Sequence, residues 1–492
     1  MKSLTLAPIA FAILLSGCAV GPDYQVPTTN LASEYLFQGA EGTQAGELNL
    51  DNNAQHNTWW HGFNDPVLNK LVVDAQSQSI PLKIAAERIK MAQSYQTAIE
   101  SFKVPTVNLG AGFGNYQISD NDPLLGGAIT ATNPLTGKEL GLVDDNNSAF
   151  FAGATIAWQA DLFGQIDRQA NAAAIRKQQA EIMRQGLTTL ITSDVIHNYL
   201  QMRGAQERKH IALSTVADQQ RTLDLVKLVV KSGYGSKLDE AQAKAMLAAT
   251  QAVIPQLEIA ENVHKQRLAI LLGETPKQVM QRFPQTSTLP SFKGVIPTGL
   301  PADLLTRRPD IKIAEREMAA LNQEHGAAIA AKYPKVYLTG SPGVLAKDFD
   351  DLFSSDSVSW LASVGVSWNL FDGGRGDAMV DLQQARFDAS VLKYQHTVIA
   401  AFGEVETLLQ GYGHSQQYVR LVTEAEAETN NAVNKAKSLY KAGLTDYLSI
   451  LDAQRQHNLL KDRVVAAKLQ TAHLTIGLHK ALGGDWQQPQ QG

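Results

Sequence analysis

One residue near the start of the chain could carry covalent chemistry. Cys18 is the only cysteine among 492 residues, and it closes the run Leu14-Leu15-Ser16-Gly17. Lys2 supplies a positive charge, and the apolar stretch from Leu4 to Leu15 is too short to span a bilayer as a helix. This order of features indicates a secretory signal, and an exported chain with one cysteine cannot build an internal disulfide framework.

The run before Cys18 resembles a bacterial lipobox. The resemblance implies cleavage before Cys18 and acylation of its sulfur and of the new amino group. Residues 1–17 are then a lipoprotein signal peptide, and 475 residues (492 − 17) remain. Ala19 stands where an Asp would resemble an inner-membrane retention signal, which indicates the outer membrane. The alternative is a chance cysteine in a plain signal peptide.

The other reactive side chains do not form a catalytic pattern. The eleven histidines are scattered, and His56 and His61 lack partner ligands at the spacing of a zinc site. No nucleophile elbow, phosphate-binding loop or dinucleotide fingerprint occurs. We therefore expect no enzyme activity, no cofactor and no metal. A net charge of −5 gives no signal for nucleic-acid binding.

The segments that must position any site occur in two copies. Trp158 and Lys231-Ser232-Gly233 match Trp368 and Lys441-Ala442-Gly443, each at an offset of 210 (368 − 158 and 441 − 231). Motifs around Pro105 and Pro334 are offset by 229, so the first copy carries a longer loop around residues 117–147. These matches predict two tandem halves of about 200 residues rather than short solenoid repeats.

Each half is predicted to run helix, strand, loop, strand, long helix, turn, helix. In the strand from Val358 to Leu370, Trp360 and Val364 lie on one face and Ser363 on the other. This period of two fits membrane strands with lipid on one side and water on the other. The alternative is the core of a soluble sandwich. No later run reaches the roughly 20 apolar residues of a membrane helix, so any crossing is expected to use strands.

Long helices are predicted from Leu162 to about Lys231 and from Asp377 to Lys441. Glycines break both, and new helical patterns begin at Leu238 and Leu448. Each pair of helices predicts a hairpin whose tip lies far from the strands. Four strands cannot close a membrane barrel, because closed barrels begin at about eight strands. Two copies would give a barrel filled by its own side chains, whereas three would supply twelve strands and room for a pore. Such a conduit needs no catalytic residue.

Several motifs resemble those of the outer membrane factor family, the TolC and OprM group of trimeric efflux channels, and most closely its acylated OprM-like branch. The resemblance covers almost the whole mature chain. The residues that carry it are Cys18 to Tyr24 with Pro27, Trp59 to Leu68, Gly299 to Ile311 with its Arg-Arg-Pro-Asp signature, Asn369 to Arg375, and Leu451 to Arg455.

The resemblance implies an α+β membrane protein. Three copies would form a 12-stranded outer-membrane β-barrel, continued by a long α-helical periplasmic barrel with a mixed equatorial domain. It also implies a passive gated duct of a tripartite multidrug efflux system that exports small toxic compounds. The implied partners are a periplasmic membrane-fusion adaptor and an inner-membrane pump of the RND or major-facilitator class. The alternatives are a TolC-like exit duct for type I protein secretion and a non-channel periplasmic scaffold lipoprotein.

The resemblance and the repeats together predict the domain limits. An N-terminal equatorial segment covers residues 18–80, and an equatorial linker covers 275–308. The first repeat covers 81–274, with strands at about 104–117 and 147–160. The second repeat covers 309–482, with strands at about 334–345 and 357–370, and a polar tail covers 483–492.

The resemblance further assigns a gate to the tips of the hairpins. It implies a constriction formed by Leu448 and Asp452, one turn apart, with Asp239 and Tyr440 in a network that latches neighbouring coils. Three copies of Asp452 around an axis would repel one another and bind cations. The alternative role of Asp452 is to cap or solvate a helix tip.

Contacts with the adaptor are expected at the turns of the same hairpins. The candidate residues are Gly233, Ser236, Gly443 and Thr445. Thr445 occupies the position where the family pattern has an arginine partner of the tip network, so this chain lacks that arginine.

Overall fold

The computed structural model describes residues 20–28, 32–37, 39, 42–45, 58–123, 126–132, 134–136, 138, 146–283 and 287–484. Cys18 and the predicted signal peptide lie outside these residues, as does the end of the predicted tail from residue 485.

The described chain divides into two compact units. The first, here called the strand unit, contains the residues up to Gln25, Ala92–Lys177 and Met318–Ala389. The second, the hairpin unit, contains Val26–Met91, Gln178–Glu317 and the residues from Ser390 onward. Each unit therefore takes segments from both sequence repeats, so the tandem halves do not coincide with the compact units.

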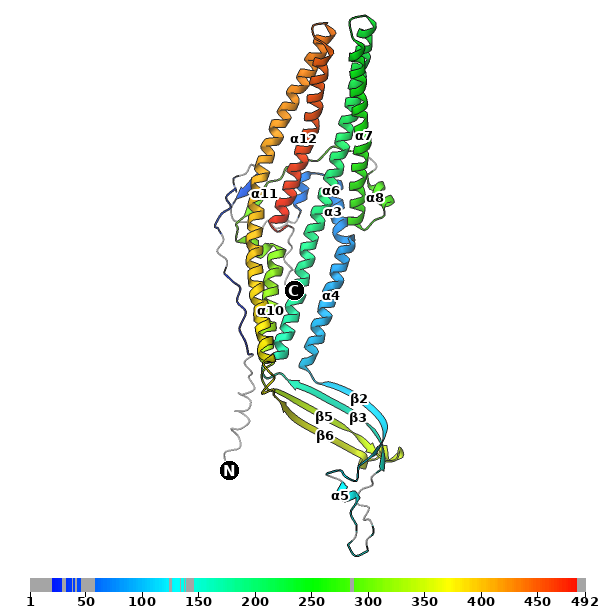
Figure 1. Ribbon diagram of the computed structural model, residues 1–492, viewed down its shortest axis with the longest axis vertical. Helices are drawn as coiled ribbons and strands as arrows, with labels where there is room; N and C mark the ends of the chain where they lie inside the picture. Colours follow the sequence, from blue (N-terminus) through cyan, green and yellow to red (C-terminus); the bar gives the residue numbers. More distant parts are fainter. Residues whose placement is uncertain are drawn as a thin grey trace. The chain divides into compact units, whose positions relative to one another are not determined.

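Four antiparallel strands form the sheet of the strand unit (Figure 1). They are β2 (Thr106–Gln117), β3 (Asn146–Ala160), β5 (Lys335–Ala346) and β6 (Val358–Ser367), and their order in the sheet is β2-β3-β5-β6. The two strands of each repeat pair as a hairpin, and β3 pairs with β5 across the repeats. The lengths of 10 to 15 residues match or exceed the roughly 9–11 residues of a tilted membrane strand.

The central pair of strands approaches closely at two glycines. Gly153 of β3 lies opposite Gly343 of β5. A Cβ atom added at Gly153 would lie 2.7 Å from the carbonyl oxygen of Pro342 and 2.8 Å from the Cα of Gly343. Only glycine fits such a contact, so the two glycines allow the strands to lie this close together.

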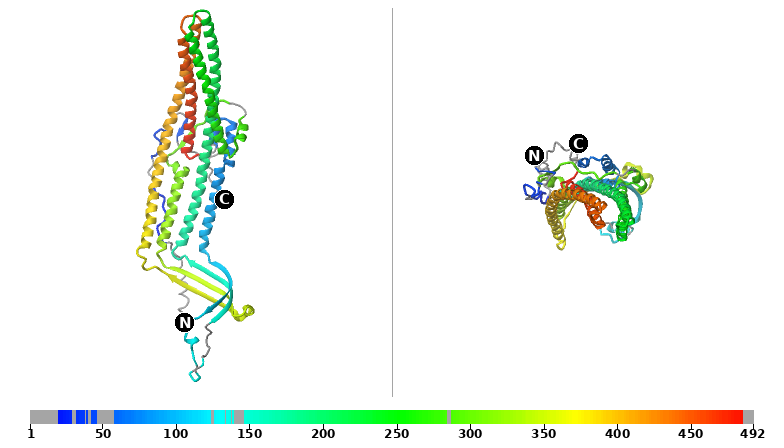
Figure 2. Two further views of the ribbon diagram at one scale, coloured as in Figure 1. Left: turned by 45° about the vertical axis from the view of Figure 1, so that its right-hand side comes forward. Right: turned by 90° about the horizontal axis from the view of Figure 1, so that it is seen from above.

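Two long hairpins dominate the hairpin unit. Helix α6 (Gln165–Lys231) and helix α11 (Arg375–Lys441) both contain 67 residues, and both start in the strand unit. They are followed by α7 (Lys237–Leu272) and α12 (Tyr447–Ala481). Figure 2 shows the two hairpins side by side at their turns. Each repeat also begins with one further helix, α4 (Ile80–Glu100) or α10 (Pro309–Ala330).

The remaining elements connect these helices and strands. They are β1 (Thr43–Ala45), η2 (Trp59–Phe63), α3 (Pro66–Gln78), η3 (Ser101–Lys103), α5 (Gly126–Ile129), α8 (Pro276–Arg282), β4 (Ile296–Gly299), α9 (Asp303–Arg307), η4 (Asp350–Phe353) and η5 (Ser355–Ser357). The short strands β1 and β4 pair in parallel, so the predicted N-terminal segment and the predicted linker meet in the hairpin unit.

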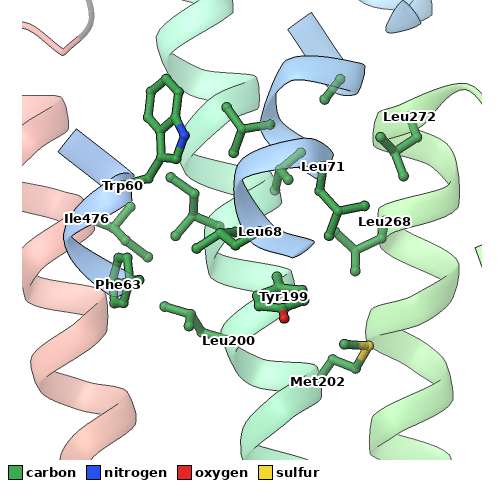
Figure 3. Close-up of a cluster of buried hydrophobic side chains, with 14 of the residues drawn as sticks. Trp60, Phe63, Leu68, Leu71, Tyr199, Leu200, Met202, Leu268, Leu272 and Ile476 are labelled. Atoms are coloured by element: carbon green, nitrogen blue, oxygen red, sulfur yellow. The ribbon is translucent and has the colours of Figure 1, made fainter. Parts of the chain in front are cut away.

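The largest buried apolar cluster lies where α3 packs on α6, α7 and α12 (Figure 3). Leu68 and Leu71 of α3 are almost fully buried, as are Tyr199 of α6 and Leu268 of α7. Asp65 caps α3 by accepting from the amide of Leu68 at 3.2 Å, and its second oxygen accepts from the Tyr199 hydroxyl at 2.6 Å. One carboxylate therefore starts α3 and ties it to α6.

Two predicted element bounds were wrong. Strand β6 ends at Ser367 rather than at Leu370, because the Trp368 side chain bonds the backbone of Lys332 and the chain then turns through Gly373 and Gly374, both at positive φ. Helix α6 begins at Gln165 rather than at Leu162, because Gly164 has a φ of 77° that no right-handed helix contains.

Replacement of Gly153 by valine tests the close approach of β3 and β5. The added Cβ would meet backbone atoms of β5, so we expect Gly153→Val to lower the free energy of unfolding by about 3 kcal/mol or more. The folded fraction on unheated SDS gels measures this loss. Gly114→Val is the matched control, because open space surrounds Gly114 of β2. Equal folded fractions for the two variants would contradict the close contact.

Candidate functional site

The pairing of the four strands gathers the apolar side chains onto one face of the sheet. In all three strand pairs, the alternating apolar positions of one strand lie opposite the alternating apolar positions of its partner. We call this the apolar face; it consists of Val107, Leu109, Ala111, Phe113, Phe150, Ala152, Ala154, Ile156, Trp158, Ala160, Val336, Leu338, Gly340, Pro342, Val344, Ala346, Val358, Trp360, Ala362, Val364 and Val366.

This apolar face is open to the outside in the single chain. Leu109 is 87% exposed, Trp360 76% and Val364 72%. Exposed apolar surface this extensive marks an interaction with another protein or with a membrane. The structure does not pack a second sheet on these side chains within the described residues, which is what the soluble-sandwich interpretation requires.

The opposite face of the sheet carries mostly small and polar side chains. We call it the polar face, and it includes Thr106, Asn108, Gly110, Gly112, Gly114, Ala149, Phe151, Gly153, Thr155, Ala157, Gln159, Lys335, Tyr337, Thr339, Ser341, Gly343, Leu345, Ser359, Leu361, Ser363, Gly365 and Ser367. The hydroxyls of Thr339 and Ser363 hydrogen-bond across the strands at 2.7 Å. Sheet faces that separate in this way suit lipid on one side and water on the other.

Matching indole contacts mark the end of the sheet where the helices begin. The Trp158 indole N–H donates to the Lys103 carbonyl at 3.1 Å, and that of Trp368 donates to the Lys332 carbonyl at 2.9 Å. The two lysines form ion pairs with Asp167 and Asp377, the equivalent residues at the starts of α6 and α11. Indole rings that are partly exposed and partly hydrogen-bonded suit a boundary between lipid and water.

The two hairpin turns share one backbone geometry. Gly233 has a φ of 84° and Gly443 a φ of 71°. After Gly233, the amide of Tyr234 donates to the Val229 carbonyl at 3.1 Å, and after Gly443 the amide of Leu444 donates to the Leu439 carbonyl at 2.9 Å. Each glycine therefore ends its long helix with a left-handed residue and a Schellman pair of bonds.

Two of the predicted adaptor-contact residues make hydrogen bonds at the helix starts after the turns. Ser236 accepts from the amide of Leu238 at 3.0 Å, and its own amide donates to the Asp239 carboxylate at 3.0 Å. The two residues thus form a capping box at the start of α7. Thr445 lies in the equivalent turn and hydrogen-bonds the Ser449 hydroxyl at 2.7 Å.

An aromatic pair of the second hairpin lies behind the turns, in a cluster that joins the two hairpins. The rings of Tyr440 and Tyr447 meet edge to face with centroids 6.2 Å apart, and both side chains are buried in a cluster with Val226 of α6, Leu247 of α7 and Ile450 of α12. The cluster ties α6 and α7 to α11 and α12 by apolar contact. The sequence reasoning singled out Tyr440 but missed Tyr447, which the helical spacing of the α12 core could have indicated.

The structure brings Tyr440 and Asp239 near each other without a hydrogen bond between them. Burial raises the pKa of the Tyr440 phenol, and the negative charge of Asp239 raises this pKa further. The Tyr440 hydroxyl is buried and makes no hydrogen bond within the described part of the chain. It therefore stays protonated and remains available as a donor.

The predicted constriction residues lie on the outside of α12 in the single chain. Leu448 is 49% exposed, and Asp452 is exposed one turn further along the helix. Asp446, rather than Asp452, caps α12 by accepting from the amide of Ser449 at 3.1 Å. Asp452 is therefore not the helix cap. Its carboxylate faces solvent in the single chain, as the alternative role of solvating the helix tip also predicts.

Metal sites and membrane-spanning helices are not found among the described residues. Among them, no group of three or more His, Cys, Asp or Glu side chains is placed to hold a metal ion. In the same residues, no helix combines the length and the apolar character that crossing a membrane requires.

Known proteins resemble this chain over almost its whole length. The family model described as "Outer membrane efflux protein" matches residues 71–274 and 300–484. The solvent efflux pump outer membrane protein SrpC of Pseudomonas putida is 28% identical over 482 residues, which cover 97% of this chain and 98% of the relative. The cation efflux system protein CusC of Escherichia coli is 27% identical over 490 residues, 99% of this chain and 100% of the relative. The solved outer-membrane channel OprN aligns with a TM-score of 0.85 and 29% identity, over 95% of this chain and 99% of that chain.

The capping box gives a direct test of the turn geometry. Ser236→Ala removes the acceptor for the first turn of α7, so we expect a loss of about 1 kcal/mol of local stability. Amide hydrogen exchange of residues in the first turn of α7 measures this loss. Ser438→Ala is the control, because the Ser438 hydroxyl bonds the carbonyl of Asn434 inside α11 and supports no helix end. Equally fast exchange in both variants would argue against the cap.

Proposed function

This chain belongs to the outer membrane efflux protein family, and from this premise we propose that three copies of it assemble into one continuous duct. The chain is a channel of an efflux system in the outer membrane, and it is not an enzyme. The duct crosses the outer membrane as a barrel of strands and continues into the periplasm as a barrel of helices. The observation that carries the proposal is the four-stranded sheet with its one apolar face.

Two edges of this sheet have no strand partner in the described chain. Strand β2 pairs only with β3, and strand β6 pairs only with β5. A strand edge in hydrocarbon leaves backbone N–H and C=O groups without hydrogen bonds, which lipid does not tolerate. Pairing of β6 from one copy with β2 from the next removes every edge. Three copies of four strands then form a twelve-stranded barrel with the apolar face outside and the polar face inside.

The same threefold assembly builds the periplasmic part from the hairpins. Each copy contributes α6, α7, α11 and α12, so three copies supply twelve helices around a common axis. The predicted equatorial segments, which include β1, β4 and the cluster around α3, form a belt on these helices. Lipids on Cys18 add a second attachment to the outer membrane.

The partners follow from the family and from the direction of transport. A passive duct has no source of energy, so an inner-membrane pump of the RND or major-facilitator class drives export, and a periplasmic membrane-fusion adaptor joins the two. The adaptor contacts the turns at Gly233, Ser236, Gly443 and Thr445. The cargo consists of small toxic compounds, in keeping with relatives named for the efflux of solvents and of cations.

The gate of the duct lies at the periplasmic tips. Leu448 and Asp452 face the axis, where three leucines form an apolar constriction and three carboxylates hold cations. Their exposure in the single chain supports this role, since neither side chain is used in the packing of its own copy. Asp239 and Tyr440 form the latch between neighbouring coils. This role is supported by the nearness of the two residues and by the Tyr440 hydroxyl, which makes no hydrogen bond in the described chain.

Conductance measurements test the duct and its gate together. In planar bilayers we expect small, cation-selective channels from the wild-type protein. Asp452→Ala and Leu448→Ala each raise the conductance severalfold, because they remove the charged and the apolar part of the constriction, and Asp452→Ala also weakens the preference for cations.

The control for these variants is Asp462→Ala, which removes an exposed carboxylate of the same helix that pairs with Arg208. An unchanged conductance in both gate variants would place the constriction elsewhere. Folded protein that forms no channel at all would favour the scaffold alternative.

Labelling of single cysteines tests which face of the sheet is wet. Ser363 and Val364 are neighbours on β6 and are both exposed in a single copy. In the assembled duct, Ser363→Cys reacts with a charged water-soluble thiol reagent and Val364→Cys is protected by lipid, with a difference in rate of about tenfold or more. The lipid on Cys18 keeps the background low, because the chain has no other cysteine. Equal rates would support a soluble sheet.

A further inference from the structure

Two large apolar side chains stand together on the polar face. Phe151 of β3 and Leu345 of β5 are direct partners in the strand register. They are 47% and 53% exposed, respectively. Both lie toward the loop end of the sheet, since Leu345 is one residue from the end of β5 and far from the strand ends that lead into helices. The pair is therefore an apolar patch on a face that otherwise suits water.

The Phe151 ring is held against the backbone of the neighbouring strand. Gly112 of β2 lies directly opposite Phe151. A Cβ atom at Gly112 would lie 2.7 Å from Cζ of the Phe151 ring, so the ring covers the glycine. Open space surrounds the Cβ positions of Gly110 and Gly114 on either side. The ring thus packs on the glycine backbone and remains half exposed.

The rest of the polar face offers little that could distinguish one solute from another. Its charged residue in the described strands is Lys335, at the end of β5 that leads from the helices. Most of the others are Gly, Ser, Thr, Ala, Asn or Gln. Leu361, 68% exposed, and Tyr337, 37% exposed, are further large side chains of this face. Leu361 lies opposite Ser341, and Tyr337 lies between Gln159 and Gly365, so neither has an apolar partner there.

We propose that Phe151 and Leu345 are specificity-determining residues of the duct, which favour apolar and aromatic cargo in the outer part of its lumen. This inference rests on the proposed trimeric duct, in which the polar face lines the lumen. Three copies of the pair then form a band of three apolar patches around the pore. An apolar solute that contacts a patch removes both surfaces from water, whereas a hydrated ion gains nothing there.

The patches act on passage and not on the gate. The gate residues lie on α12 in the hairpin unit, and the apolar pair lies in the strand unit. Variants of the pair should therefore change the interaction with apolar solutes and leave the small ions that carry the basal current almost unaffected.

Block of the ionic current by an apolar cation tests the inference. Tetraphenylphosphonium is added to channels of the full-length protein in planar bilayers, with tetramethylammonium as the hydrophilic probe. Phe151→Thr and Leu345→Thr keep residues suited to strands but remove the apolar surface. In the double variant we expect the concentration of tetraphenylphosphonium for half block to rise at least about tenfold. The half-block concentration of tetramethylammonium and the conductance without a blocker remain as in the wild type.

Leu361→Thr is the matched control, because it removes one exposed leucine from the same face at a position without an apolar partner. The inference would be overturned by an unchanged half-block concentration in the double variant, or by an equal rise in Leu361→Thr. The proposed duct would still stand in either case, because the variants form channels. Single-residue variants, Phe151→Thr or Leu345→Thr alone, replace the double variant if it fails to form channels.

A second measurement separates the inference from the duct. Phe151→Cys should react with a charged water-soluble thiol reagent in the assembled protein. Protection of this cysteine in channels that conduct normally would place Phe151 away from the lumen and overturn the inference alone. Absence of channels from the folded wild type would overturn the proposed duct and the inference with it.

Discussion

The register of one antiparallel sheet is the constraint on which the other features of this protein depend. Because β2, β3, β5 and β6 pair so that most of their apolar side chains fall on one face, that face cannot remain in water at low cost. The two edges of the sheet add a second demand, since they have no strand partner in the described chain. A slip of one residue in any pair would mix the two faces and remove the basis for membrane insertion.

Duplication gives this sheet two equivalent connections to helices. Trp158 and Trp368 bind equivalent backbone carbonyls, and their lysines pair with equivalent aspartates at the starts of α6 and α11. The two turns at Gly233 and Gly443 repeat the same bonds. The copies differ where function is expected: the first turn carries a capping box with Asp239, and the second carries the exposed pair Leu448 and Asp452. Equal helices with unequal tips suit the proposed duct, in which one hairpin of each copy closes the end.

The tips combine stable local geometry with a polar group that is not satisfied inside one copy. Schellman bonds and caps hold the turns, and the apolar cluster around Tyr440 and Tyr447 holds the hairpins together. The Tyr440 hydroxyl remains buried without a partner in the described chain. A buried donor of this kind costs free energy until it finds an acceptor, so it suits an element that exchanges partners during opening.

The sequence alone determined the features that arise from local rules. The alternation of the strands, the uninterrupted helices, the turn glycines and the lipobox-like run are all legible in short segments, because side-chain period and backbone preference act over a few residues. Tertiary structure alone decided which strand faces coincide, that the compact units mix both repeats, and that Asp446 rather than Asp452 caps α12. It also brought Phe151 beside Leu345 and Asp239 near Tyr440, pairs separated by about 200 residues. Such contacts depend on the pairing of distant segments, which no local pattern specifies.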